Sequence, residues 1–96
     1  MHSIVTEKVP NGKLVRIKVD YDTIINSIQI TGDFFLHPED TIELLEKSVT
    51  GASATSDVAF FKNNFETVIK KSNATLIGVT TDDLARLTKQ ALEVKQ

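Results

Sequence analysis

Residues 32 to 36 read Gly32-Asp33-Phe34-Phe35-Leu36, where an alternating strand pattern ends and just ahead of a helix-start signal at His37-Pro38-Glu39-Asp40. Successive side chains of an extended segment face opposite ways, so two adjacent Phe rings in such a segment cannot both point into one small core. Two interpretations stay open at this point. Either both rings find core contacts, or one of them contacts a partner.

Upstream of this pentapeptide, three alternating runs predict a three-stranded antiparallel meander. Residues 3–9 and 13–19 each alternate, and Pro10-Asn11-Gly12 between them is a hairpin signal. In the third run one face carries Ile24, Asn26, Ile28 and Ile30, and the other carries Ile25, Ser27, Gln29 and Thr31. The core side is expected to hold Val15, Ile17, Val19, Ile28 and Ile30, with Leu14, Arg16, Lys18 and Gln29 on the far side. One face of the sheet is therefore core and the other is mostly polar.

Downstream of the pentapeptide, a first helix is predicted over about residues 38–49. His37 would be its cap, Pro38 suits its first position, and Gly51 falls where a left-handed terminating residue is expected. Its core face would hold Ile42, Leu45 and Val49. Leu44 lies on roughly the opposite side of this helix. It is therefore either covered by another segment or exposed to a partner.

A second helix is predicted to begin after Ser56 or Asp57 and to run to about Lys71. Its buried face would hold Phe61, Phe65, Val68 and Ile69. Phe60 is rotated by about 100 degrees from its neighbour on that face, so it lies at the edge of the apolar stripe. Phe60 is therefore a second candidate for apolar surface that the core does not need.

A third helix is predicted over about residues 81–94, after a connector of residues 72–79. Thr80 would cap it, with Asp83 completing a variant of the capping box. Its buried residues would be Leu84, Leu87, Ala91 and Val94. The predicted fold is α+β, with a three-stranded antiparallel sheet and three helices packed on one face.

The composition is that of one ordinary globular domain spanning residues 1–96. The chain is 41% hydrophobic and 25% charged, and no apolar run approaches the ~18 residues that a membrane helix needs. Its first residues lack the charged and apolar blocks of a signal peptide, so we expect a cytoplasmic protein that does not contact a membrane.

Several classes of chemistry are excluded by the residues that are missing. The chain has no cysteine, and its net charge is -2 with scattered basic residues, so thiol chemistry and nucleic-acid binding are not expected. Its four glycines stand apart, so no phosphate loop is present, and neither His2 nor His37 has a second histidine at metal-ligand spacing. We therefore expect no catalytic residue, no bound cofactor and no metal site.

Charge is nevertheless uneven along the sequence. Residues 33–51 hold Asp33, Glu39, Asp40, Glu43 and Glu46 against Lys47, a local balance of -5 + 1 = -4. Acidic residues in a first helical turn suit the helix dipole, so a solvated helix face explains this segment. The alternative is an acidic docking surface.

Three segments resemble the C-terminal accessory domain of bacterial lipoate-protein ligases. They are Gly12-Lys13-Leu14-Val15-Arg16-Ile17, Ile24-Ile25-Asn26-Ser27-Ile28-Gln29-Ile30-Thr31-Gly32-Asp33-Phe34-Phe35, and the run from Pro38 to Gly51. The segment Gly78-Val79-Thr80-Thr81-Asp82-Asp83-Leu84 looks like that domain's last helix entry, so the resemblance covers about residues 12–92. In many bacteria the domain is fused behind a catalytic domain, whereas some archaea encode it separately. A chain of 96 residues looks like the separate small subunit.

The resemblance implies a two-chain enzyme that joins lipoate to ATP, giving lipoyl-AMP and pyrophosphate, and then acylates a lysine of a lipoyl-accepting protein. The separate catalytic chain would bind lipoate and ATP with magnesium, since the family's pocket motifs are not in this sequence. The alternative is a binding module that recruits the lipoyl-accepting protein without affecting adenylation. The fold is also similar to iron–sulfur scaffold proteins, some of which use cysteine, and the lack of cysteine argues against sulfur transfer here.

We expect the interface with the catalytic chain to use apolar residues that the core does not need. Aromatic and other large apolar side chains are favoured at the centres of such interfaces. The candidate interface residues are Gly32, Asp33, Phe34, Phe35, Leu44 and Phe60. The sequence leaves open which of the two adjacent Phe rings faces outward.

Overall fold

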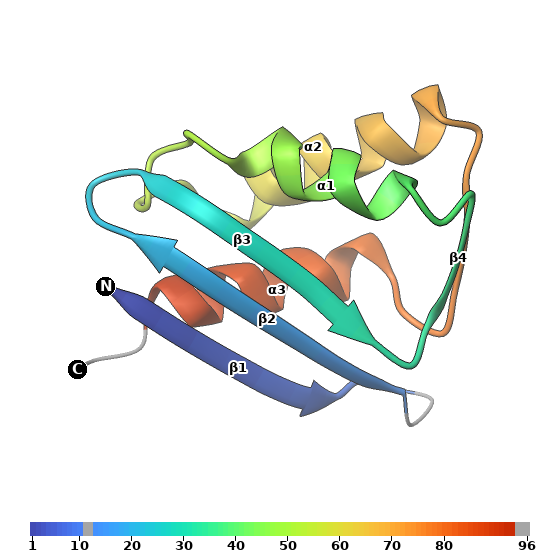
Figure 1. The fold of residues 1–96 in the computed structure, drawn as a ribbon, viewed down its shortest axis with the longest axis horizontal. Coiled ribbons are helices and arrows are strands. Elements are labelled where there is room, and N and C mark those ends of the chain that lie inside the picture. Colours follow the sequence, from blue (N-terminus) through green and yellow to red (C-terminus); the bar gives the residue numbers. More distant parts are fainter. Residues whose placement is uncertain (11–12, 94–96) are drawn as a thin grey trace.

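The first three strands form an antiparallel sheet in the computed structural model, which describes residues 1–10 and 13–93. They are β1 (His2–Lys8), β2 (Leu14–Tyr21) and β3 (Ile25–Gly32). β2 lies in the centre and pairs with both neighbours (Figure 1). The predicted meander is confirmed, while the expected Asn11-Gly12 turn between its first two strands lies outside the described residues.

A bulge in β3 corrects one part of the predicted sheet. The alternation predicts Ile24 on the core face and Ile25 on the far face, but Ile25 is fully buried and Ile24 is exposed. Asp20 of β2 pairs with Ser27, and the next residue, Tyr21, pairs with Ile25. Asn26 is therefore an extra residue in β3. An extra residue reverses the alternation of faces. Ile28 and Ile30 lie beyond the bulge and are buried, as predicted.

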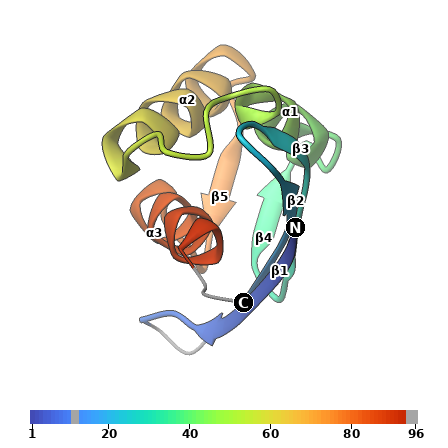
Figure 2. The same ribbon diagram turned by 90° about the vertical axis from the view of Figure 1, so that its left-hand side faces the viewer.

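Three helices lie on one face of this sheet, as predicted. They are α1 (Thr41–Val49), α2 (Val58–Lys71) and α3 (Thr81–Leu92). α1 packs on β3, α3 packs on β1 and β2, and α2 packs on the other two helices (Figure 2). Within the described residues, no helix has both the length and the apolar character needed to cross a membrane. Val94, which was predicted in the third helix, lies outside the described residues.

The ends of these helices follow from local sequence signals. The Asp57 carboxylate accepts the Phe60 N–H at 2.9 Å at the start of α2. At the start of α3, Thr80 Oγ1 accepts the Asp83 N–H at 3.0 Å, and the Asp83 carboxylate accepts the Thr80 N–H at 3.1 Å, so the predicted capping box is confirmed. Gly51 follows α1 with a φ of +88°, the left-handed conformation predicted there.

The start of the first helix differs from the prediction. His37 does not cap a helix, because it ends a short strand, and Pro38 lies in a turn before α1. In this turn the Thr41 N–H donates to the Pro38 carbonyl at 3.0 Å. The helix therefore begins at Thr41 after Asp40, three residues later than predicted.

A second sheet is absent from the predicted architecture. β4 (Phe35–His37) and β5 (Thr75–Ile77) pair antiparallel and form a two-stranded ribbon at one end of the molecule. Figure 1 shows this ribbon beyond the end of β3, at the right of the view. Three-residue strands are too short to give an alternation signal, which explains why the connector of residues 72–79 gave no strand prediction.

One hydrophobic core joins the sheet to all three helices. The sheet contributes Val15, Ile17, Val19 and Ile25, and the helices contribute Leu45, Val49, Phe61, Phe65, Leu84 and Leu87, all almost completely buried. The predicted core faces of the three helices are therefore confirmed, with Ile42, Val68 and Ile69 only partly buried against this core.

Glu46 connects α1 to the edge of the sheet. Its carboxylate accepts the backbone N–H of the buried Ile30 at 2.8 Å. Among the described strands, none pairs with β3 on that side. We expect Glu46→Ala to lower the free energy of unfolding by about 1–3 kcal/mol, because it leaves a buried donor unpaired. Urea unfolding measures this, with Glu43→Ala on the exposed side of α1 as the control. Equal stability of the two variants would contradict the assignment.

Candidate docking surface

The outward face of the β4–β5 ribbon exposes a pair of large apolar side chains. Phe35 and Ile77 lie directly opposite each other in the ribbon and are 53% and 59% exposed. Residues directly opposite in an antiparallel pair share one face. Leu36 and Leu76, which alternate with them, pack against the core. The ribbon therefore has one face in the core and one apolar face toward solvent.

His37 extends this outward face along β4. Its ring stacks on the Phe35 ring, with centroids 6.3 Å apart and planes inclined by 11°. Thr75 lies opposite His37 in the ribbon and is also exposed. We call Phe35, His37, Thr75 and Ile77 together the ribbon face. It combines two apolar residues, one flat aromatic heterocycle and one hydroxyl group.

Hollows lie on both sides of the ribbon face. Beside β4 a groove of about 360 Å³ is lined by Gly32, Phe34, Phe35, His37, Glu39 and Ile42. Beside β5 a second groove of about 500 Å³ is lined by Pro10, Ile77, Gly78, Thr80 and Asp83. The ribbon face is thus a ridge between two grooves, a shape that a complementary protein surface can enclose on both sides.

Carboxylates border this surface on the β4 side. Glu39 lines the groove itself, Asp33 is exposed just before β4, and Asp40 is exposed in the turn before α1. Glu43 is exposed on α1 and lines a separate hollow with Asn26 and Lys47. Across the residues that the structure describes, none of these four carboxylates makes an ion pair. The local excess of negative charge in the sequence is therefore not neutralised within the described fold.

The structure decides which of the two adjacent rings is exposed. Phe34 is partly buried and packs against the core, whereas Phe35 points to solvent. Gly32 lies under the Phe34 ring, and the Asp33 N–H donates to the Leu14 carbonyl at 2.9 Å, so both fix the exit from β3. The structure therefore brings Gly32, Phe34 and Phe35 together at one groove, while their role as an interface stays a prediction.

The other two candidate residues do not join this groove. Leu44 and Phe60 are 48% and 41% exposed, and neither lines either groove beside the ribbon. The side-chain amide of Asn64 donates to the Ser48 carbonyl at 3.2 Å. Ser48 lies one turn after Leu44 in α1, and Asn64 lies one turn after Phe60 in α2. α1 and α2 run in opposite directions (Figure 1). Leu44 therefore lies to one side of the Ser48–Asn64 contact along the helices, and Phe60 lies to the other. They form two separate exposed sites on the helical layer.

Three members of the ribbon face, His37, Thr75 and Ile77, are not among the candidates from the sequence. The sequence places Thr75 and Ile77 in a connector, although Thr75-Leu76-Ile77 followed by Gly78 is a β-prone triplet with a glycine exit, and Gly78 has a φ of +96°. It predicts His37 as a helix cap. These errors have one cause, since the partner of each short strand lies about forty residues away in the chain.

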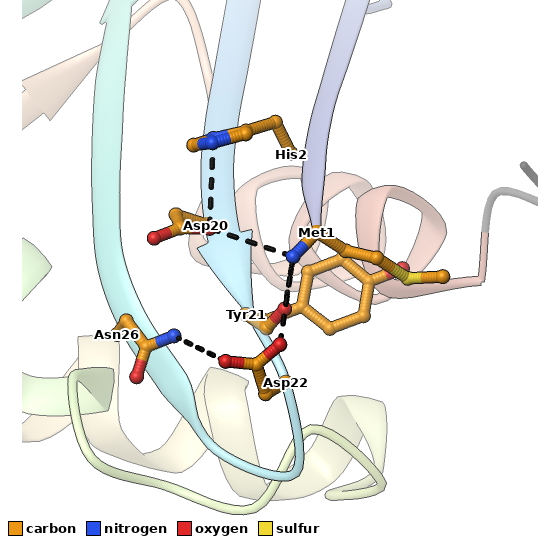
Figure 3. A network of polar contacts seen from close by, with 6 residues as sticks. All are labelled: Met1, His2, Asp20, Tyr21, Asp22 and Asn26. Carbon is orange, nitrogen blue, oxygen red and sulfur yellow. Dashed lines mark hydrogen bonds and ion pairs between the residues drawn. The ribbon is translucent and has the colours of Figure 1, made fainter.

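A network of charged groups at the opposite end of the sheet has a structural role. The Met1 amine donates to the Tyr21 carbonyl at 2.8 Å and lies 3.6 Å from a carboxylate oxygen of Asp20 and of Asp22 (Figure 3). Asn26 donates to Asp22 at 3.3 Å. These contacts fasten β1 to the end of β2 and to the turn after it. Among the described residues, no group of three acidic or histidine side chains is arranged to hold a metal ion.

The ion pairs of Arg86 also have a structural role. Its guanidinium donates to Glu7 at 2.7 Å and lies 3.6 Å from Asp83, so it links α3 to β1. The hydrogen bond to Glu7 raises the pKa of Arg86 above its ordinary value. Both side chains are partly exposed, so water screens the pair and its contribution to stability is small.

The chain is similar in sequence and fold to a chain of a solved structure. No model of a protein family matches the chain, and no curated protein matches it. A solved structure from Thermoplasma acidophilum, described as an archaeal lipoylation system with a bipartite lipoate protein ligase and its E2 lipoyl domain, does match. The matched chain is 29% identical, the match covers 99% of this chain and 100% of that one, and the TM-score is 0.70.

This likeness confirms the resemblance to the lipoate-protein ligase accessory domain and the α+β fold that it implied. The chain is related to a component of the bipartite ligase system over its whole length. A role in protein lipoylation follows as the supported class of function.

Proposed function

We propose that this chain is the accessory subunit of a two-chain lipoate-protein ligase. It binds a separate catalytic chain and enables that chain to activate lipoate with ATP. The single observation that supports this role is the end-to-end match with a chain of the bipartite ligase system, without a large unmatched segment in either chain. We assign the complex to the cytoplasm, where the ATP that this chemistry consumes is available.

In this proposal the catalytic chain carries out both steps of the reaction. There the lipoate carboxylate attacks the α-phosphorus of ATP, which forms lipoyl-AMP and releases pyrophosphate. The acceptor lysine amine then attacks the lipoyl carbonyl and releases AMP. Lipoate, ATP and magnesium would bind the catalytic chain, because the present sequence has no phosphate loop. This chain contributes binding free energy and no reacting group.

Binding free energy promotes the reaction if the accessory chain prefers the activation-competent conformation of the catalytic chain. A ligand shifts an equilibrium only by its difference in affinity for the two conformations. Coupling free energies of this kind are typically about 1–3 kcal/mol, which corresponds to a 5- to 150-fold effect. We therefore expect stimulation of lipoate activation in this range.

Separate assays of the two half-reactions test the proposal. We expect lipoate-dependent exchange between pyrophosphate and ATP by the catalytic chain to rise by about 10- to 100-fold when this chain is added. Transfer from preformed lipoyl-AMP to the acceptor lysine is expected to change far less, because the activated intermediate is already supplied. Equal exchange rates with and without this chain would refute the proposed role.

A second function has support from one observation, since the matched structure describes a ligase together with its lipoyl domain. In this alternative the chain recruits the lipoyl-accepting protein and leaves adenylation unchanged. The same two assays separate the alternatives. Recruitment would leave pyrophosphate exchange unaffected and would weaken transfer to the acceptor when this chain is omitted.

A further inference from the structure

We propose that the ribbon face is the surface that binds the catalytic chain, and that it fits an apolar pocket bordered by Lys and Arg side chains. This inference rests on the proposed function and adds the contact site and the chemistry of the partner surface. It also narrows the earlier candidates, because it assigns the contact to Phe35 with Ile77 and leaves out Leu44 and Phe60.

Exposed apolar residues are paired on the ribbon. Ile4 on the open face of the large sheet is as exposed as Ile77, at 58% against 59%. However, Ile4 lies opposite the charged Lys18, whereas Ile77 lies opposite the apolar Phe35. Two large apolar side chains that share one exposed face form a patch, and contiguous apolar patches mark binding surfaces more often than single residues do.

The shape of the ribbon face also favours a contact with another protein. The Phe35–Ile77 pair forms a ridge, with a groove of about 360 Å³ beside β4 and one of about 500 Å³ beside β5. A ridge with a groove on each side allows a partner to surround the apolar pair and exclude water from it. Residues at the centre of such a contact contribute most of the binding free energy, and aromatic rings are favoured there.

The charge beside the ribbon face selects the kind of partner. Glu39 lines the groove beside β4, and Asp33 and Asp40 are exposed in the segments directly before and after β4. Among the described residues, none of these three carboxylates makes an ion pair. A second copy of this chain would bring the same carboxylates against them, and like charges facing each other across an interface cost free energy. A pocket bordered by basic side chains would instead attract this surface and orient it. The ribbon face therefore fits a basic-rimmed partner better than a second copy.

Binding measurements with matched variants test the inference. The probe is the catalytic lipoate-protein ligase chain encoded in the same genome, titrated by calorimetry. We expect the double variant Phe35→Ala/Ile77→Ala to bind about 30-fold more weakly or worse, the effect of losing a central contact. The control Ile4→Ala/Ile24→Ala, which also removes two exposed apolar side chains, is expected to bind within about threefold of the original chain.

A charge variant keeps the inference testable if the double variant folds poorly. In Glu39→Gln/Asp40→Asn the size of the side chains is kept, and Asp40 makes no side-chain hydrogen bond at the start of α1. We expect this variant to bind more weakly at low salt and to lose part of the salt dependence that the original chain shows, since salt screens exposed charges. Unchanged affinity and unchanged salt dependence would refute the charge argument.

The outcomes separate this inference from the proposed function. If the original chain neither binds nor stimulates the catalytic chain, the proposed function fails. A different outcome is that the original chain both binds and stimulates the catalytic chain, and that Phe35→Ala/Ile77→Ala, shown by circular dichroism to be folded, binds with the same affinity. In that case only the ribbon assignment fails. A loss of binding in Leu44→Ala/Phe60→Ala with none in the ribbon variant would likewise overturn it and place the contact on the helices.

Discussion

Replacing Phe65 by Ala is expected to destabilise the fold by about 3–5 kcal/mol, the usual cost of removing a buried Phe ring. Phe61 and Phe65 are the two fully buried side chains of α2, and α2 packs on α1 and α3. Their rings therefore fill the junction of the three helices. Because a small domain is stable by roughly 5–15 kcal/mol in total, this change removes a large share of its stability.

Urea unfolding followed by circular dichroism measures this loss. Phe60→Ala is the matched control, since it removes the same ring from the preceding turn of the same helix at a position that is 41% exposed. We expect the control to cost about 1 kcal/mol or less. Similar midpoints for Phe60→Ala and Phe65→Ala would show that the junction of the helices is not packed as described.

Gly32→Ala is expected to destabilise the fold by about 2–3 kcal/mol, within the range found for overpacked positions. A Cβ added at Gly32 would collide with the backbone oxygen of Leu14 and would lie 3.1 Å from the Phe34 ring. The Leu14 oxygen accepts the Asp33 N–H at 2.9 Å, so it cannot move away without losing that bond. The absence of a side chain at Gly32 is therefore what allows the chain to leave β3 and form the ribbon.

Gly51→Ala is the control for this change. Gly51 has a φ of +88°, so Ala there carries the cost of a left-handed backbone, about 1 kcal/mol, but no atom lies within 4 Å of the added Cβ. Chemical denaturation of both variants compares the two costs. If Gly32→Ala is no less stable than Gly51→Ala, Gly32 does not lie as close to the Leu14 backbone as the structure shows.

The large sheet and the helices were predictable because their signals are local. Alternation over seven or eight residues defined β1 to β3, and the capping residues Asp57 and Thr80 marked the starts of α2 and α3. The bulge at Asn26 was not predictable, since it depends on how β3 pairs with the end of β2. One extra residue there exchanged the environments of two adjacent isoleucines.

The candidate site was predictable only in part. The Phe34-Phe35 pair left two interpretations open, with both rings in the core or one ring outside it, and the structure shows Phe35 exposed. Its neighbour Ile77 could not be found from the sequence, because the two meet through a pairing between segments about forty residues apart. Phe60 was expected at the edge of the apolar stripe, whereas for Leu44 the sequence left open whether another segment covers it; both are exposed in the structure. Helix periodicity carries no information on whether exposed residues are adjacent.

The most direct test of the account is a titration of the catalytic chain with this chain, with lipoyl-AMP as the measured product. The proposed accessory role predicts that the initial rate of lipoyl-AMP formation rises with added chain and saturates at one equivalent, with Phe35→Ala/Ile77→Ala requiring far more protein for the same effect. A rate that does not depend on this chain at any ratio would contradict the account.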